Sequence, residues 1–218
     1  MTLPLALLQL VSPALPVGGF GYSEGLEVLF QKGELNEIAS LKSWLEAELQ
    51  TGLLRVEAAA LAPLQQAMIC NDAPALFELN GWLLAQRDAV EMRAQQLQMG
   101  QSLLQLLALM GWPLSMQKPE LGWTAAWAWA GSCFDVPGDN LLEAYLYNWV
   151  ANQISAAVRL VPFGASSGQC LQLQLAPLIS AQSIFLWRKD PRSMFSAGVG
   201  AGLAQLQHGG LYSKLFRS

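Results

Sequence analysis

Residues 12–27, Ser-Pro-Ala-Leu-Pro-Val-Gly-Gly-Phe-Gly-Tyr-Ser-Glu-Gly-Leu-Glu, are the stretch around which the rest of the chain is organised. Pro13 and Pro16 fix φ near about −65°, and the glycines that follow permit conformations that other residues avoid. Four side chains of the stretch are large and apolar, and a flexible linker would give them nothing to pack against. The stretch therefore predicts an ordered turn, with Ser23 capping a helix that begins at Glu24.

The same stretch is open to several functional interpretations. The plainest is a tight turn between two core helices, because Gly and Pro also punctuate ordinary loops. A phosphate site is disfavoured, since Glu24 puts a carboxylate where the anion would lie and no Lys follows. Glu24 and Glu27 lie one turn apart and could serve acid–base chemistry, yet nothing in the sequence buries or partners them. We therefore expect a solvated helix start or a docking site for a basic partner.

The composition is that of an apolar chain with few charges. Of its 218 residues 53% are hydrophobic and 13% charged, with a mean hydropathy of +0.30. Part of this apolar surplus is expected to face a partner. The longest nearly uncharged apolar run, residues 121–134, is too short to cross a bilayer as a helix, so we expect no membrane span.

The termini and the cysteines indicate a cytoplasmic protein. The N-terminus carries neither a basic region nor a plausible signal cleavage site. Cys70, Cys133 and Cys170 are odd in number and form no CxxC motif, which argues for reduced thiols. We expect all three to be small buried hydrophobes.

The net charge of −4 is unevenly distributed. Residues 159–218 hold six basic residues and one acidic residue, a balance of +5 that leaves −9 for the rest. This asymmetry favours contact between the C-terminal part and an acidic surface, either its own N-terminal part or another protein. The six bases are widely spread and no aromatic stacking motif accompanies them, so the sequence predicts no nucleic-acid site.

Helical periodicity runs through the chain and predicts an all-α, multi-helix bundle in a single domain, residues 1–218. The expected helices cover residues 3–10, 24–33, 40–50, 53–68, 71–112, 120–134, 140–159, 177–187 and 193–207. The longest is a central helix that starts at Asn71 or Asp72, carries Pro74 in its first turn and ends before Pro113. Residues 169–175 alternate as a strand would, but one strand cannot stand alone.

Two further helix starts are expected from capping residues. Ser40 is expected as an N-cap, and Asn140 with Glu143 as a capping box. Met92 and Met99, one heptad apart, are interpreted as core residues and not as metal ligands.

The sequence contains no recognisable catalytic set. HExxH, GxSxG and CxxC motifs are absent, and His208 is the only histidine. Transition-metal sites normally gather several N or S donors, so we interpret His208 as solvent-exposed or packed on a partner. The sequence therefore predicts a protein that is not an enzyme, with no metal site and no cofactor.

Four segments, in order along the chain, resemble signature segments of the UreF family of urease accessory proteins. Residues 12–27 hold every fixed position of the pattern Ser-x-x-Leu-Pro-x-Gly-x-Phe-x-x-Ser-x-Gly-Leu-Glu. Residues 91–104 resemble an Arg-containing segment that ends in Gly-x-Ser-Leu-Leu. Residues 152–169 form the third segment, and residues 208–218 resemble a terminal His…Tyr-Ser-Arg-Leu-Phe pattern.

The chain departs from the family pattern at two positions. Ala165 stands where family members often carry Gln, and Lys214 stands in place of Arg. Because Lys cannot form the planar bidentate fork of Arg, a contact at position 214 is expected to be weaker.

The resemblance implies a non-catalytic homodimer that works in urease maturation. It implies binding to the accessory protein UreD (UreH in some systems), recruitment of the nickel-carrying GTPase UreG, and coupling of the GTP cycle to metal delivery into apo-urease. A metallochaperone that carries nickel itself is the alternative. The implied partner-binding residues are Pro16, Gly18, Phe20, Ser23, Gly25, Glu27, Arg93, Arg159, Gln169, His208, Tyr212, Ser213, Lys214 and Phe216.

The tail at residues 208–218 combines a Gly-Gly entry with apolar and basic side chains. This combination suits a mobile segment that folds upon a partner, because ordering is then deferred until burial offsets its entropy. The alternative is that the tail packs on its own domain as a final helix.

Overall fold

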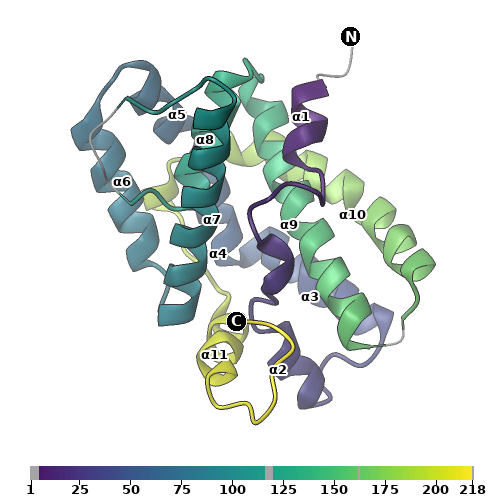
Figure 1. Cartoon of the computed structure of the whole chain (residues 1–218). Helices are drawn as coiled ribbons and strands as arrows, with labels where there is room; N and C mark the ends of the chain where they lie inside the picture. Colours follow the sequence, from purple (N-terminus) through teal and green to yellow (C-terminus); the bar gives the residue numbers. More distant parts are fainter. Residues whose placement is uncertain (1–4, 116–119, 162, 218) are drawn as a thin grey trace.

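The computed structural model describes residues 5–115, 120–161 and 163–217, and within these ranges the chain forms helices and no strand. Figure 1 shows the helices in chain order. They are α1 Leu5–Leu10, η1 Gly19–Gly21, α2 Leu26–Gln31, α3 Ile38–Thr51, α4 Leu53–Ala59, α5 Leu61–Ile69, α6 Ala73–Ala85, α7 Val90–Leu109, α8 Trp123–Cys133, α9 Gly138–Leu160, α10 Ala165–Leu186, η2 Pro191–Ser193 and α11 Val199–His208, with η denoting a 3-10 helix. The expected all-α, single-domain bundle is confirmed.

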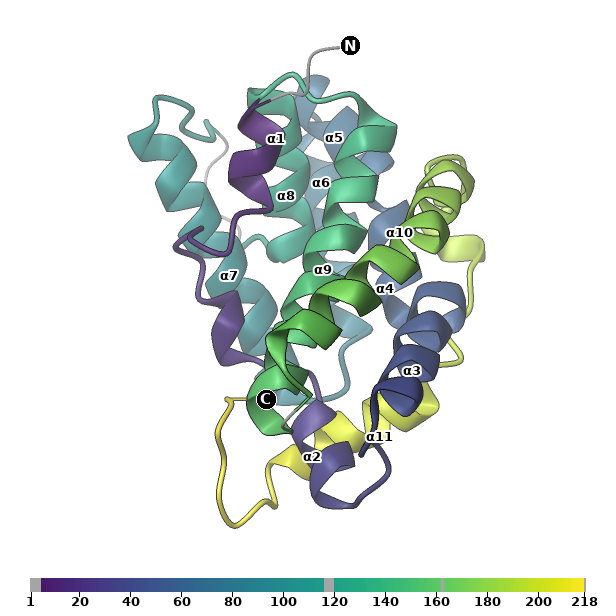
Figure 2. The ribbon, with the colours of Figure 1, turned by 90° about the vertical axis from the view of Figure 1, so that its right-hand side faces the viewer.

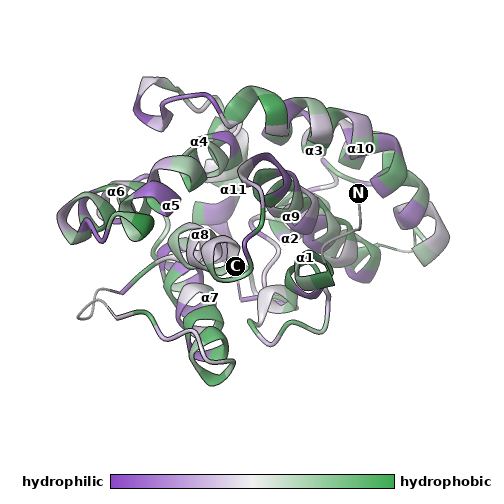
Figure 3. Cartoon of the chain, turned by 90° about the horizontal axis from the view of Figure 1, so that it is seen from above, coloured by the Kyte–Doolittle hydropathy of each residue, from purple (hydrophilic) through white to green (hydrophobic). Residues whose placement is uncertain are grey.

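Helix α9 lies at the centre of the bundle and is its longest described helix (Figure 2). It contacts α10 along much of its length, and also α2, α3, α4, α5 and α8. Trp127 on α8 is fully buried, and its indole N–H donates to the carbonyl of Leu141 at 3.2 Å. Figure 3 shows α8 and α9 inside the bundle, with α6, α7 and α10 at its periphery.

The prediction of one continuous central helix over residues 71–112 is wrong, because the structure has two helices there. Asp72 caps α6 by accepting from the Ala75 N–H at 3.1 Å, as expected, but α6 ends at Ala85. Helix α7 begins at Val90, after Ala89 leaves helical geometry with ψ 132°. Val90, the first residue after the break, is 71% exposed. The break turns Arg87 into the core, where it pairs with a buried carboxylate.

Several expected helix boundaries are also wrong. The helix expected over residues 53–68 is divided at Ala60 into α4 and α5. The strand-like residues 169–175 lie within α10, which continues through Pro177. Residue 193 belongs to η2, so the last helix starts at Val199.

Local hydrogen bonds explain two misplaced caps. Ser40 is the third residue of α3 and not its N-cap; it completes a capping box with Glu37. Helix α9 begins at Gly138 directly after Pro137, which places Asn140 inside the first turn and not at its cap. In both cases the chain enters the helix two or three residues earlier than the side chains suggested.

Candidate functional site

The N-terminal turn and the C-terminal tail meet at one end of the bundle. Figure 1 shows α2 and α11 side by side there, with the tail running back toward the turn. The Arg217 N–H donates to the Gly21 carbonyl at 2.9 Å. Arg159, from the end of α9, donates to the Phe20 carbonyl at 2.7 Å and lies 4.5 Å from the centre of the Phe216 ring. We call residues 18–27 together with 208–217 the turn–tail junction.

The Glu27 carboxylate is the main attachment point of the tail. It is buried, and it accepts the Leu215 N–H at 2.7 Å and the Phe216 N–H at 3.1 Å. His208 Nε2 lies 3.2 Å from the same carboxylate and can donate to it, while the buried Nδ1 finds no hydrogen-bond partner among the described residues. These contacts place Phe216 in the core.

The expectations for Glu27 and His208 are therefore wrong. Glu27 does not belong to a solvated helix start, because the tail supplies the donors that a buried carboxylate needs. His208 is only 1% exposed and packs within its own chain. The tail after His208 lies on its own domain without forming a final helix.

Gly25 sets the start of α2. The helix begins at Leu26 and not at Glu24, because Glu24 and Gly25 both adopt positive φ, 52° and 90°. A Cβ atom on Gly25 would lie 3.0 Å from the Ala204 Cβ, so only glycine allows α11 to approach this closely. Ser23 Oγ still serves the helix start by accepting the Glu27 N–H at 3.4 Å.

Glu24 joins the turn to the centre of the bundle. Its carboxylate accepts from Gln95 Nε2 on α7 at 2.8 Å and from the Trp149 indole N–H on α9 at 3.0 Å. Tyr22 donates its hydroxyl to Gln98 Oε1 at 2.6 Å. Gln95 and Gln98 of α7 thus bind the turn, and Glu24, like Glu27, is buried contrary to expectation.

A buried ion pair lies behind Glu24. Arg87 contacts the Glu57 carboxylate through Nε at 2.8 Å and Nη2 at 2.6 Å, and Tyr145 donates to Glu57 at 3.4 Å. Burial opposes charge on Arg87, but the carboxylates of Glu57 and Glu24 raise its pKa above the usual value. Burial raises the pKa of Glu57, and that of Tyr145 still more strongly.

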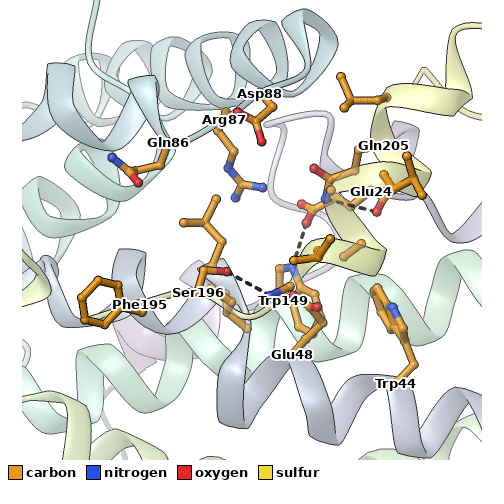
Figure 4. A pocket seen from close by; sticks show the side chains of 18 of the residues that line it. Glu24, Trp44, Glu48, Gln86, Arg87, Asp88, Trp149, Phe195, Ser196 and Gln205 are labelled. Carbon is orange, nitrogen blue, oxygen red and sulfur yellow. Dashed lines mark hydrogen bonds between the residues drawn. The ribbon is translucent and has the colours of Figure 1, made fainter.

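An open cavity of about 530 Å³ lies on the other side of Glu24 (Figure 4). Its walls include Trp44 and Glu48 from α3, Arg87 from the α6–α7 connection, and Trp149 from α9. Burial, and then the nearby charge of Glu24, raise the pKa of Glu48 to about 7. Neither Glu48 nor Arg87 could be recognised from the sequence, because no local pattern separates a buried ionisable residue from one on a solvated helix face.

The expected partner-binding residues fall into two groups. Ser23, Gly25, Glu27, His208 and Phe216 are buried, whereas Gly18 is half-buried. The exposed residues are Pro16, Phe20, Arg93, Arg159, Gln169, Tyr212, Ser213 and Lys214. Four of these residues lie outside the turn–tail junction. Pro16 lies two residues before it, and Arg159 contacts it from α9. Arg93 donates to the Arg87 carbonyl at 3.2 Å, and Gln169 lies on α10.

The cysteine and methionine expectations have different outcomes. Cys70 and Cys170 are exposed and Cys133 is half-buried, so the expectation of three buried thiols is wrong. Met92 and Met99 are buried, as expected. Among the residues that the structure describes, no three His, Cys, Asp or Glu side chains gather as metal ligands would. In the same residues no helix is long and apolar enough to cross a membrane.

The sequence is similar to known proteins over nearly its whole length. The UreF family model matches residues 35–176. The urease accessory protein UreF of Thermosynechococcus vestitus (strain NIES-2133 / IAM M-273 / BP-1) is 39% identical, covering 98% of this chain and 97% of the relative. Proteins of the same name from Trichormus variabilis (strain ATCC 29413 / PCC 7937) and Prochlorococcus marinus (strain MIT 9215) are 40% and 37% identical, over 98% and 96% of this chain and 95% and 96% of their own lengths.

Proposed function

Because the chain belongs to the UreF family of urease accessory proteins, we propose that it is a non-catalytic scaffold for nickel insertion into apo-urease. In this role it binds a UreD/UreH-type accessory protein, recruits a UreG-type GTPase and regulates its GTP cycle. It acts in the cytoplasm as a homodimer. Nickel is cargo of the assembly and needs no resident cofactor in this chain.

The observation that carries the proposal is the composition of the turn–tail junction. Two segments that resemble family signatures, nearly two hundred residues apart, form one surface. Phe20 is 71% exposed and Tyr212 fully exposed, although both are large aromatics. Exposed aromatics beside basic side chains are typical anchors of protein interfaces. The junction is therefore the proposed contact for the UreD/UreH-type partner.

The buried residues of the junction have a different proposed role. Glu27, Gly25 and Phe216 touch their own chain and fix the backbone that presents the exposed side chains. Arg159 serves both roles, because it holds the Phe20 carbonyl while remaining exposed. Changes at buried positions should affect folding first, and changes at exposed positions should affect binding alone.

The homodimer is proposed from the apolar residues that remain exposed away from the junction. Leu109 at the end of α7 is 87% exposed and Leu173 on α10 is 77% exposed. Symmetric dimers are the commonest way to cover such surface. Sedimentation equilibrium tests this directly: a monomer at concentrations of about tens of micromolar would contradict an obligate dimer.

Co-purification with the two accessory partners, with urease activation as a second readout, tests the proposed contact. The double variant Phe20→Ala/Tyr212→Ala should fold normally, lose the UreD/UreH-type partner and fail to activate apo-urease. Ile69→Ala removes an exposed apolar side chain that belongs neither to the junction nor to the proposed dimer surface, and this variant should bind normally. Normal binding and activation by the double variant would refute the contact. Equilibrium dialysis against nickel tests the alternative function, a metallochaperone that carries nickel itself. Tight nickel binding that is lost when His208 and Cys170 are changed would favour the nickel carrier over the scaffold.

A further inference from the structure

The open cavity beside Glu24 has features of a binding site and includes none of the family-implied partner residues. In Figure 4 the side chains of Glu24, Glu48 and Arg87 surround its centre, and Trp44 and Trp149 stand on one side. Residues between 194 and 206, before and within α11, complete the lining. Five parts of the chain that are distant in sequence thus enclose one volume of about 530 Å³.

The charge on the cavity walls is negative. Glu24, Glu48 and Asp88 line it, against the single cation Arg87, which is already paired with Glu57. The wall at 194–206 contributes no ionisable side chain. Unlike Glu24, Glu48 has no hydrogen bond or ion pair to its carboxylate among the described residues. The raised pKa of Glu48 agrees with this, because burial acts on the carboxylate without a bonded partner to offset it.

Two tryptophans give the cavity an aromatic side. The rings of Trp44 and Trp149 stack with their centres 5.7 Å apart and their planes at 26°. Both residues line the cavity together with Glu48. An indole face attracts a cation, and the attraction grows when the cation is removed from water. Carboxylate and indole together favour a positively charged ligand.

An organic cation fits these walls better than a metal ion. Among the described residues, carboxylates, thiols and imidazoles do not gather in the threes that a metal ion would need. A guanidinium group satisfies a carboxylate and stacks on an indole at the same time, which a compact ammonium group cannot do. The walls therefore favour the side chain of arginine over that of lysine.

The rim of the cavity indicates that the cation belongs to a protein. Phe195 is 90% exposed, Val199 78%, and Leu203 and Leu206 just over half, and all four border the cavity. These residues continue the cavity into an apolar surface, whereas a site for a small free cation needs no such extension. Arginine flanked by apolar side chains is a typical anchor at the centre of an interface.

We propose that this cavity receives an arginine side chain of a partner protein, with its guanidinium paired to the Glu48 carboxylate and packed against the Trp44–Trp149 pair. The apolar neighbours of that arginine then cover Phe195 and the exposed side of α11. This site is separate from the turn–tail junction, so it goes beyond the function proposed above.

Titration of the free protein with capped tripeptides tests the proposal without any urease component. The probes are Leu-Arg-Leu and the same peptide with citrulline, which is neutral but similar in shape, followed by the indole N–H signals of Trp44 and Trp149. The arginine peptide should shift both signals saturably and bind at least about tenfold more tightly than the citrulline peptide. Free N-acetyl-arginine amide should bind more weakly than the tripeptide because it lacks the apolar flanks.

A pair of variants on one helix provides the control. Glu48→Gln keeps the shape of the cavity and should reduce affinity for the arginine peptide to that of the citrulline peptide. Glu46→Gln on the same helix removes a carboxylate that pairs with Lys42 and should change nothing. Equal binding of the two peptides, unchanged affinity in Glu48→Gln, or no saturation at about 10 mM would each overturn the proposal.

The pH dependence supplies a second readout. Protonation of Glu48 below about pH 7 should weaken binding of the arginine peptide, and Glu48→Gln should abolish that dependence. The other ionisable groups near Glu48 are Glu24, Arg87 and Asp88 in this cavity, with Glu57 behind Arg87. Lys32 and Glu34 line a neighbouring cavity together with Glu48. Persistence of the same pH dependence in Glu48→Gln would assign it to one of these groups and contradict the role of Glu48.

Discussion

Replacing Glu48 by Gln should make the free protein more stable at neutral and alkaline pH. Burial, together with the charge of Glu24, raises the pKa of this carboxyl group from 4.5 to about 7. Between these values the folded protein keeps the proton while the unfolded chain releases it, so the free energy of unfolding falls as the pH rises. At about 1.4 kcal/mol for each pKa unit, the full effect is about 3 kcal/mol. Since Glu48 is half-buried, we expect Glu48→Gln to raise the free energy of unfolding by about 1–3 kcal/mol in practice.

Urea unfolding at pH 5, 6, 7 and 8 measures this effect. The stability of Glu48→Gln minus that of the unmodified protein should grow from pH 5 to pH 8, because the amide carries no charge at any of these values. Taking the difference between the two proteins cancels the contributions of groups that do not interact with Glu48. Glu46→Gln should show no such growth. A difference that stays constant with pH would refute the raised pKa and its physical cause.

Three further predictions concern backbone packing and the tail. Gly25→Ala should destabilise the protein by about 1–3 kcal/mol, and more than Gly33→Ala does. Both glycines have positive φ, but only at Gly25 would the new Cβ press on α11. Thermal unfolding of the two variants measures the difference. Gly100→Ala should lower the melting temperature because the new Cβ would lie 2.3 Å from the Leu121 carbonyl oxygen. Gly81→Ala, whose new Cβ would meet no neighbouring atom within 4 Å, should raise the free energy of unfolding by up to about 1 kcal/mol. Glu27→Ala should lower the melting temperature and expose the tail to proteases, because two N–H groups and His208 lose their acceptor. Glu34→Ala, at an exposed position, should do neither. An unchanged digestion pattern in Glu27→Ala would show that other contacts hold the tail.

Periodicity was sufficient to predict the all-α bundle, because an apolar stripe at helical spacing has to be buried whatever its partner is. It failed between Ala85 and Val90, since the spacing of apolar residues continues across the break as though the helix did. Only the buried pair of Arg87 with Glu57, which lies thirty residues earlier in the chain, explains why the helix stops there. That contact is tertiary and leaves no local pattern.

The candidate sites were predictable to different degrees. The turn at residues 12–27 was recognisable because proline, glycine and large apolar residues rarely alternate so closely in a solvated loop. Its partners were not: Glu24 and Glu27 resemble the acidic first turn of any exposed helix until Gln95, Trp149 and the tail are placed around them. Glu48 likewise follows Glu46 on an amphipathic helix, and only the three-dimensional packing separates the carboxylate in the cavity from the one in solvent.

The bond from Phe216 to Glu27 spans 189 positions of the chain, and this has a consequence for biosynthesis. A ribosome makes the turn first and the tail last, so for most of translation the Glu27 carboxylate lacks the N–H donors that compensate for its burial. The junction can close only after residue 217 has left the ribosome. A chain that ends before residue 215 would therefore leave the Glu27 carboxylate without the two N–H donors that the tail supplies.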